Sequence, residues 1–210
     1  MHVNVYVDGF NLFYGCLKGT PYKWLDLDAL CQTMLPCDDI HRIRYFTARV
    51  TARPDNPLAD TRQDIYLRAL TTIPHLAIHL GRFQQSIARM PLARPVPGAP
   101  KIVEVIKTEE KRTDVNIATY LLSDAFDRDC EAAVMITNDS DLAEPVHLLR
   151  QKFKMPIGIL NPYQRAPCSR DLASARPMFI KHIKTRALRD SQFPNTLKDQ
   201  KGVITRPATW

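Results

Sequence analysis

Short apolar runs alternate along this chain with longer segments in which apolar residues recur every three or four positions. The runs are typical of buried strands and lie at residues 3–8, 42–50, 76–84, 132–137, 156–160 and 178–183. The longer segments predict helices at residues 11–17, 25–35, 57–72, 113–126, 142–153 and 169–175, with Thr113 as the N-cap of its helix. Strands separated by helix-length segments favour parallel neighbours, because a parallel pair requires a crossover connection. We therefore predict an α/β protein with three α/β/α layers around a mainly parallel, Rossmann-like sheet.

One domain accounts for most of the chain. Its 210 residues, 45% of them hydrophobic, suit a single sizeable core with some elaborations. We expect the domain to span residues 1–183, with a Pro-rich, basic loop or hairpin inserted at about 84–106. Residues 184–210 are polar, basic and interrupted by proline, so a mobile or loosely docked C-terminal tail is expected there.

The sequence favours a cytoplasmic location. No stretch approaches the roughly 20 apolar residues needed to cross a bilayer, and the N-terminus begins with a strand-like segment in place of a signal sequence. The five cysteines are odd in number and widely scattered, without the close pairs of a structural zinc site or a redox dithiol. We expect reduced, mostly buried thiols and no association with a membrane.

The formal net charge is +7. A basic protein attracts polyanions over long distances, so this charge favours RNA or another phosphate-rich partner. Charge alone does not establish such a partner, since many basic proteins bind no nucleic acid.

Aspartates end apolar strands or begin helices in three separate segments. They are Asp8 in VYVDGFN, Asp114 in KRTDVN, and Asp139 with Asp141 in MITNDSD. In an open α/β sheet the carboxyl ends of strands and the helix N-termini that follow them share one edge, where ligands bind. We therefore predict that these four residues form one acidic catalytic site.

Four converging carboxylates repel one another unless a cation neutralises them. Mg²⁺ or Mn²⁺ suits such an open, oxygen-rich site, because Mg²⁺ binds through a few carboxylates together with substrate phosphate. The alternative for each single residue is helix capping, and Asp141 with Glu144 could form a capping pair. Capping alone does not explain why three acidic segments share one edge.

Polar neighbours of these acids are candidates for substrate binding. Asn11 could contact a substrate phosphate or a metal-bound water, or it could hold the turn at Gly9 through side-chain to backbone bonds. Asn138 and Ser140, together with Thr137, could bind substrate or orient the carboxylates, although turn formation explains them nearly as well.

Three cations precede Asp114. Lys107, Lys111 and Arg112 could draw in a phosphate and offset the negative charge of a phosphoryl transition state. The alternative is a solvated, charged turn that also contains Glu109 and Glu110.

Several segments together resemble the NYN domain family, relatives of the PIN-like nucleases that include the LabA-like proteins. The resemblance runs from about residue 3 to 183 and rests on VDGFNLFYG, YFTAR, RQDIYLRAL, KTEEKRTDVNIATYLLSDA and ITNDSDLAEPV. It implies a PIN-like, Rossmann-like fold and metal-dependent cleavage of phosphodiesters, usually in RNA. The acids that it implies for this chemistry match Asp8, Asp114, Asp139 and Asp141.

The resemblance also covers polar positions outside the acidic set. Asn11 matches a characteristic polar position of the family. Arg62 and Gln63 match the RQ of its central helix, which implies a polar contribution near the site, unless they simply begin a surface helix. The insertion at 84–106 and the tail after 184 lie outside the family pattern and could set substrate choice.

The resulting hypothesis is a metal-dependent endoribonuclease in which bound Mg²⁺ or Mn²⁺ activates water for attack on a phosphodiester. No histidine is assigned a role, because the six histidines show neither metal-ligand spacing nor a nucleophile partner. Candidates for guiding RNA are Arg49, Arg53, Arg82, Arg89, Arg94, Lys101 and the basic tail, with Tyr45, Phe46 or Phe83 for stacking, although these aromatics are expected mainly in the core.

Two other functions are compatible with the same residues. One is a noncatalytic RNA-binding or regulatory module that keeps the acidic fold, and the other is a small-molecule phosphohydrolase that uses the same metal chemistry. Pairing as a homodimer is left open by the sequence.

Overall fold

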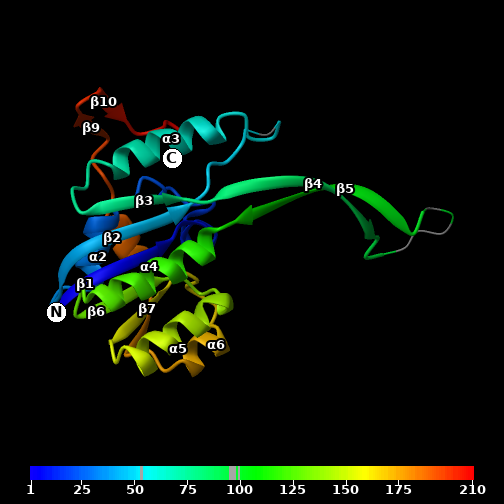
Figure 1. Cartoon of the computed structure of the whole chain (residues 1–210). Helices are drawn as coiled ribbons and strands as arrows, with labels where there is room; N and C mark the ends of the chain where they lie inside the picture. The colour runs from blue at the N-terminus through cyan, green and yellow to red at the C-terminus, as the bar shows by residue number, and fades with distance from the viewer. Residues whose placement is uncertain (53, 95–97, 99) are drawn as a thin grey trace.

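The computed structural model describes residues 1–52, 54–94, 98 and 100–210. Its centre is a six-stranded sheet with the order β3-β2-β1-β6-β7-β8, in which every neighbouring pair is parallel (Figure 1). The strands are β1 (His2–Asp8), β2 (Asp39–Thr47), β3 (Leu76–Leu80), β6 (Ala132–Ile136), β7 (Ile157–Asn161) and β8 (Phe179–His182). The predicted parallel, Rossmann-like sheet is confirmed.

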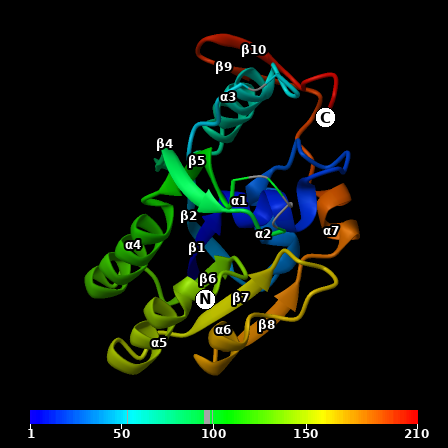
Figure 2. The ribbon, with the colours of Figure 1, turned by 90° about the vertical axis from the view of Figure 1, so that its right-hand side faces the viewer.

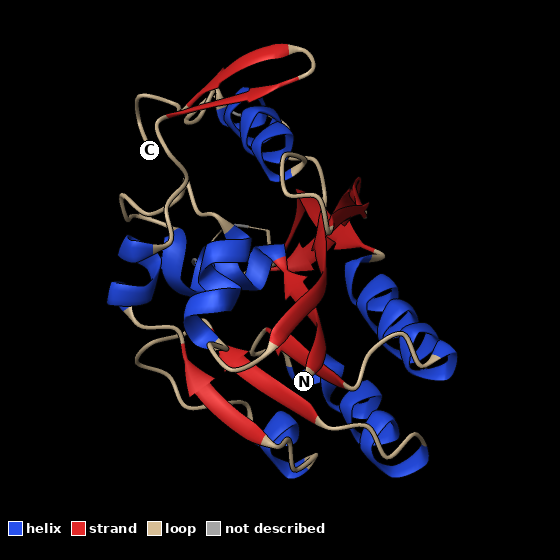
Figure 3. Cartoon of the chain, turned by 90° about the vertical axis from the view of Figure 1, so that its left-hand side faces the viewer, coloured by secondary structure: helices blue, strands red, loops and turns tan. Residues whose placement is uncertain are grey.

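Helices cover both faces of this sheet, which confirms the three-layer arrangement. One face carries α1 (Gly9–Leu12), the π-helical turn η1 (Phe13–Leu17), α2 (Leu27–Met34), α3 (Ala59–Leu70) and α7 (Thr185–Asp190). The other face carries α4 (Thr113–Asp127), the 3₁₀ turn η2 (Ser140–Leu142), α5 (Ala143–Lys152) and α6 (Arg170–Ser174) (Figures 2 and 3). Within the described residues no helix is both long and apolar enough to span a bilayer.

The strands of the centre are buried on both faces, as their nearly continuous apolar sequences require. Tyr45 and Phe46 are neighbours on β2, yet Tyr45 packs in the core on the α2 face and Phe46 in the core on the α4 face. In the register of the sheet Val7 of β1 lies opposite Ile136 of β6. The residues that follow these two, Asp8 and Thr137, therefore meet at the carboxyl edge of the sheet.

A two-stranded antiparallel hairpin projects from this edge, away from the body of the protein (Figure 1). We call it the β4–β5 arm; it consists of β4 (Arg82–Pro91) and β5 (Ile102–Lys111). The single strand predicted at 76–84 is wrong, because the chain leaves the sheet at Gly81. A Cβ atom at Gly81 would lie 2.7 Å from the backbone carbonyl oxygen of Lys111, so the close approach of the arm to the sheet requires glycine there.

The arm is longer than the hairpin predicted at about 84–106, and residues 95–97 and 99 of that segment lie outside the described residues.

The expectation of a mobile or loosely docked tail after residue 184 is wrong. This segment forms α7 and an antiparallel pair, β9 (Thr196–Asp199) and β10 (Gly202–Thr205). Leu188, Phe193 and Ile204 are buried in the core, and the indole N–H of Trp24 donates a 2.8 Å hydrogen bond to the carbonyl of Pro194. Single apolar anchors between polar residues hold the segment, and they produce no long apolar run in the sequence.

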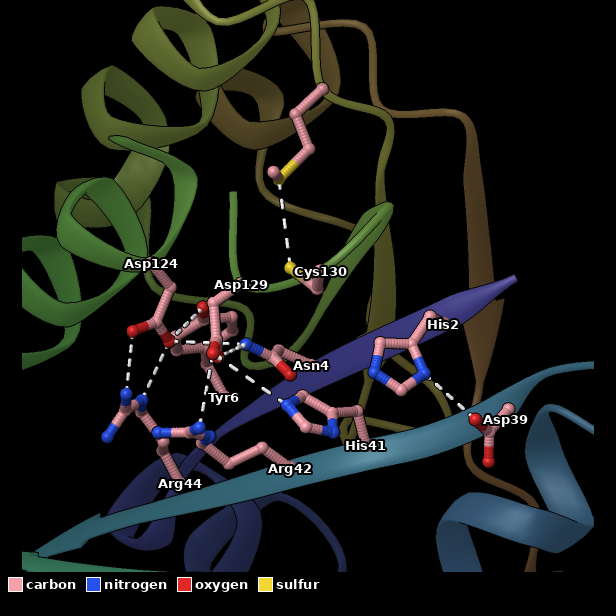
Figure 4. A network of polar contacts seen from close by, with 11 residues as sticks. His2, Asn4, Tyr6, Asp39, His41, Arg42, Arg44, Asp124, Asp129 and Cys130 are labelled. Atoms are coloured by element: carbon pink, nitrogen blue, oxygen red, sulfur yellow. Dashed lines mark hydrogen bonds and ion pairs between the residues drawn. The ribbon is translucent and has the colours of Figure 1, made fainter. Parts of the chain in front are cut away.

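A buried polar network attaches α4 to the sheet (Figure 4). Arg44 of β2 donates two hydrogen bonds to the carboxylate of Asp124, at 2.8 and 2.6 Å, and the Tyr6 hydroxyl donates a third at 2.7 Å. The side-chain amide of Asn4 donates to Asp129, just beyond α4, at 2.8 Å. These contacts fix the carboxyl-terminal half of α4 and thereby the direction in which its N-terminus points.

Candidate metal centre

Three aspartates converge at the carboxyl edge of the sheet. Asp8 ends β1, Asp139 follows β6, and Asp114 lies in the first turn of α4. One carboxylate oxygen from each lies within 4.8 Å of those of the other two. The site is therefore assembled from three segments that are far apart in the sequence.

Asp8 and Asp139 also cap the helical turns that follow them. Oδ1 of Asp8 accepts the backbone N–H of Asn11 at 2.9 Å, and Oδ1 of Asp139 accepts that of Asp141 at 3.0 Å. Capping and metal binding are thus compatible, because each carboxylate has a second oxygen. The capping pair of Asp141 and Glu144 that the sequence also allowed does not form, since Asp139 caps η2 and Leu142 holds the N-cap position of α5.

Two hydrogen-bonded links fix Asp8 relative to Asp139. The hydroxyl of Thr137 donates to Oδ2 of Asp8 at 3.2 Å and accepts the backbone N–H of Asp139 at 3.1 Å. The side-chain oxygen of Asn11 accepts the backbone N–H of Asn138 at 2.8 Å. Asn11 therefore joins the two acidic loops, in place of the side-chain bond within the Gly9 turn that the sequence also allowed.

Asp114 is placed by a residue that the sequence left in a charged turn. Glu110 accepts the backbone N–H of Thr113 at 3.3 Å and also the hydroxyl of Thr113. Helix α4 begins at Thr113, so Thr113 is not the predicted N-cap; Arg112 precedes it in the left-handed region at φ 84°. Glu110 lies three residues before Thr113, on the side of β5 that faces the cleft. The alternation along a strand shows which residues share a face with Glu110, but the sequence alone does not show that this face meets the cleft.

Burial and mutual repulsion disfavour the ionised form of the cluster. Burial, and then the charge of Asp114, raises the pKa of Asp8 to about 6, against the lowering effect of the Asn11 N–H. Burial, followed by the charges of Asp139, Glu110 and Asp141, raises the pKa of Asp114 to about 6. None of the ion pairs among the described residues involves Asp8, Asp114 or Asp139. A divalent cation with hard oxygen ligands fits this set of donors.

A model of the NYN domain matches residues 2–184 of the chain. The chain belongs to the NYN domain family. This match confirms the resemblance found in the sequence, and it assigns to the chain a nuclease-like fold whose acidic cluster can hold a metal ion.

Two known proteins are similar to this NYN protein along most of its length. One is 6-hydroxy-3-succinoylpyridine 3-monooxygenase HspA of Pseudomonas putida (strain DSM 28022 / S16), which is 29% identical over 238 residues, covering 100% of this chain and 75% of the relative. The other is the crystal structure of a protein of unknown function, VPA0982, from Vibrio parahaemolyticus RIMD 2210633. It superimposes with a TM-score of 0.56 and 14% identity, over 91% of this chain and 96% of the other. At that identity the second likeness supports the fold alone.

The NYN acidic cluster opens into a cleft of about 1230 Å³ on the side of α1, α3 and the arm. Its cationic lining residues are Lys18, Lys23 and Arg62, and the aromatic lining residues are Phe10, Phe13, Tyr14, Tyr45, Tyr66, Phe83 and Trp210. Tyr14 is 57% exposed, and Nζ of Lys18 lies 4.8 Å from the centre of its ring. The cleft therefore combines three cationic side chains and several ring surfaces with the carboxylates, which besides the three aspartates include Asp55 and Glu110.

Asp141, the fourth predicted acid, lies beside the group of three and not within it. It is exposed, and its backbone N–H is bonded to Asp139. Its charge still contributes to the raised pKa of Asp114.

The two residues predicted from the family's central helix both line the cleft, but in different roles. The amide of Gln63 accepts the N–H of Val50 at 2.8 Å and donates to the carbonyl of Ala48 at 2.9 Å, so it holds the segment after β2. Arg62 is bonded to Asn56 at the exposed rim. Arg62 is in none of the ion pairs among the described residues, so its charge can still meet a substrate, whereas Gln63 is engaged in the structure.

The predicted cations before Asp114 face away from the cleft. Lys107 and Lys111 alternate along β5 with the cleft-lining residues Thr108 and Glu110, and both form ion pairs with Glu109. This geometry agrees with the solvated charged turn that the sequence also allowed. Arg112 is exposed in the turn before α4.

The loop after β6 uses its polar side chains mainly for its own structure. Asn138 accepts the N–H of Ser169 at 2.7 Å and donates to the carbonyl of Pro167 at 3.3 Å, while Ser140 is exposed at the start of η2.

Among the predicted RNA-guiding cations, Arg49 is paired with Asp64 and Arg89 with Glu104, and Arg53 lies outside the described residues.

Proposed function

We propose that this protein is a metal-dependent ribonuclease that hydrolyses RNA phosphodiester bonds in the cytoplasm. The observation that supports the proposal most strongly is the convergence of Asp8, Asp114 and Asp139 within 4.8 Å at the ligand-binding edge of a nuclease-like fold. Such a cluster is unfavourable without a cation, because burial and repulsion raise the pKa of Asp8 and of Asp114.

The three aspartates would hold Mg²⁺ or Mn²⁺ through their carboxylate oxygens. When bound, the ion supplies Lewis-acid activation of the phosphodiester and of the attacking water. Thr137 and Asn11 hold the carboxylates of Asp8 and Asp139 at a fixed separation, because each forms hydrogen bonds between the loops that carry these two acids. Glu110 orients the first turn of α4 and so directs Asp114 toward the other two acids.

Features of the cleft favour a polymer over a mononucleotide. Lys18, Lys23 and Arg62 lie along its walls and can each neutralise a phosphate. The exposed ring of Tyr14 offers a surface on which an unpaired base can stack. A single small phosphate ester would use only part of this surface, and the net charge of +7 adds a long-range attraction for RNA.

A second candidate function is hydroxylation of a pyridine-type substrate. Its support is the 29% identity, over the whole chain, to a protein named 6-hydroxy-3-succinoylpyridine 3-monooxygenase. The aromatic and cationic cleft lining would accommodate a flat, anionic ring compound. Against it, the seven glycines of the sequence nowhere form the G-x-G-x-x-G pattern that binds dinucleotides, whereas the acidic cluster has a direct use in phosphodiester hydrolysis.

One experiment separates these functions. The purified protein is incubated with a labelled RNA oligonucleotide, with mononucleotides, and with 6-hydroxy-3-succinoylpyridine plus NADH, in Mg²⁺, Mn²⁺ or EDTA. The proposal expects metal-dependent cleavage of the oligonucleotide that is lost in Asp139→Asn. Substrate-dependent consumption of O₂ and NADH without RNA cleavage would establish the second function. Hydrolysis of mononucleotides alone would establish a small-molecule phosphohydrolase, and RNA binding without cleavage a noncatalytic module.

A further inference from the structure

The cleft-facing side of the β4–β5 arm continues outward beyond the cleft. Directly opposed residues of an antiparallel pair share one face, and that face recurs at every second residue. The pairs Phe83–Glu110 and Gln85–Thr108 line the cleft. The next pairs on the same face are Ile87–Ile106, Arg89–Glu104 and Pro91–Ile102.

This outer part of the arm, residues 87–91 and 102–106, is apolar and uncovered. Ile87 is 75% exposed, Ile106 is 76% exposed and Ile102 is 57% exposed. The opposite face of the same segment carries Ala88, Met90, Val103 and Val105. The isoleucine side chains therefore have no core of their own to enter.

An uncovered hairpin of this kind is unfavourable in isolation. A two-stranded sheet is marginally stable in water unless a third strand, a helix or another surface covers one face. Adjacent exposed isoleucines on a projecting element mark an interaction surface more often than a solvated one. The outer part of the arm would therefore gain stability from a partner that covers this face.

The charges of the outer part indicate which partner fits. Arg89 and Glu104 are its two charged residues; they lie opposite each other, 3.9 Å apart, and cancel. A neutral, aliphatic face offers little to a polyanion, whose binding depends on net positive charge. A twofold-related copy of the same face is complementary to it, because apolar side chains meet apolar side chains and each Arg89 can face the partner's Glu104.

We propose that the outer part of the β4–β5 arm is a dimer interface, in which two copies of this chain pack Ile87, Ile102 and Ile106 against each other across a twofold axis. The interface begins where the cleft lining ends, so the second copy bounds the outer end of the cleft. This proposal does not depend on the chemistry at the aspartates.

Analytical ultracentrifugation of the full chain tests the proposal. The wild type is expected to sediment as a dimer at micromolar concentration, and Ile87→Lys combined with Ile106→Lys is expected to weaken association by a factor of about 100 or more. Phe126→Lys is the matched control, because Phe126 is 77% exposed on α4, outside the arm. Unchanged melting temperatures would establish that both variants fold.

Charge reversal supplies a second readout. Arg89→Glu is expected to weaken the dimer, and addition of Glu104→Arg is expected to restore it. A wild type that stays monomeric overturns the proposal, even if it captures another protein. So does a dimer that survives both lysine substitutions, or one that Phe126→Lys disrupts equally.

Discussion

The side-chain oxygen of Asn11 accepts the backbone N–H of Asn138 at 2.8 Å, and this contact joins the loop after β1 to the loop after β6. Each loop carries one carboxylate of the candidate metal centre, Asp8 in the first and Asp139 in the second. The distance between these two carboxylates therefore depends on a residue that is not itself an acid.

Substitution of this bridging residue should weaken metal binding. Asn11→Ala removes the acceptor, and loss of a contact that orients a metal ligand typically costs about 10- to 100-fold in affinity. Calorimetric titration with Mn²⁺ measures the loss directly. Asn11→Asp keeps an acceptor oxygen and should retain more affinity than Asn11→Ala; equal affinities of wild type and Asn11→Ala would contradict this role.

Glu110 should affect the site through α4, whereas its neighbour Glu109 should not. Glu110→Ala removes the acceptor of the Thr113 N–H and hydroxyl, so Mn²⁺ affinity and RNA cleavage should fall by about tenfold. Glu110→Gln keeps an acceptor and should fall less. Glu109→Ala is the control on the opposite face of β5, where Glu109 pairs with Lys107 and Lys111; an equal loss in that variant would show that the effect is not specific to the cap.

Removal of a carboxylate should stabilise the metal-free protein above about pH 6. The pKa of Asp8 is raised from 3.8 to about 6 in the folded state. Between pH 3.8 and about pH 6 the folded state therefore binds more protons than the unfolded chain, and the free energy of unfolding falls as the pH rises through this range. In EDTA at pH 8, Asp8→Asn should therefore raise the free energy of unfolding by about 1 to 2 kcal/mol, and the gain should vanish below about pH 4. Urea unfolding at the two pH values measures both effects. A destabilised Asp8→Asn at pH 8 would contradict the claim that burial and repulsion make the ionised Asp8 carboxylate unfavourable.

The network beneath α4 should be a major source of stability. Asp124→Ala leaves Arg44 buried without its partner, which should cost about 3 to 5 kcal/mol in the free energy of unfolding. The double variant Arg44→Met with Asp124→Leu should recover part of this loss, because no unpaired charge remains. Asp127→Ala, at the exposed end of α4, is the control and should stay within about 0.5 kcal/mol of wild type. Urea denaturation of all four proteins is the measurement.

The sequence was sufficient for the sheet and for the location of the acids. β1 and β6 are buried on both faces along nearly their whole length, β1 ends at Asp8, and Thr137 follows β6, so the general rule for parallel sheets placed their loops at one edge. The family motifs gave the same order of acids. The strand ends that carry the site were therefore predictable from local sequence alone.

Contacts between distant residues were not predictable in this way. The direction of Lys107 and Lys111 depends on which face of β5 meets the cleft, and only the packing of the arm decides this. The docking of the C-terminal segment depends on single anchors such as Phe193, whose partner Trp24 is distant in the sequence. Glu110 likewise can accept the N–H of Thr113 only because the chain turns at Arg112. That residue takes a left-handed conformation that the local sequence does not predict.

Metal-dependent catalysis at the aspartates is tested by cleavage of labelled RNA with Mn²⁺ or EDTA, by wild type, Asp114→Asn and the exposed control Asp127→Asn. We expect Mn²⁺-dependent cleavage by wild type and Asp127→Asn, no cleavage in EDTA, and a rate for Asp114→Asn that is lower by a factor of about 100 or more. Cleavage that persists in EDTA or in Asp114→Asn, or a wild type that cuts no RNA with any divalent metal, would contradict it.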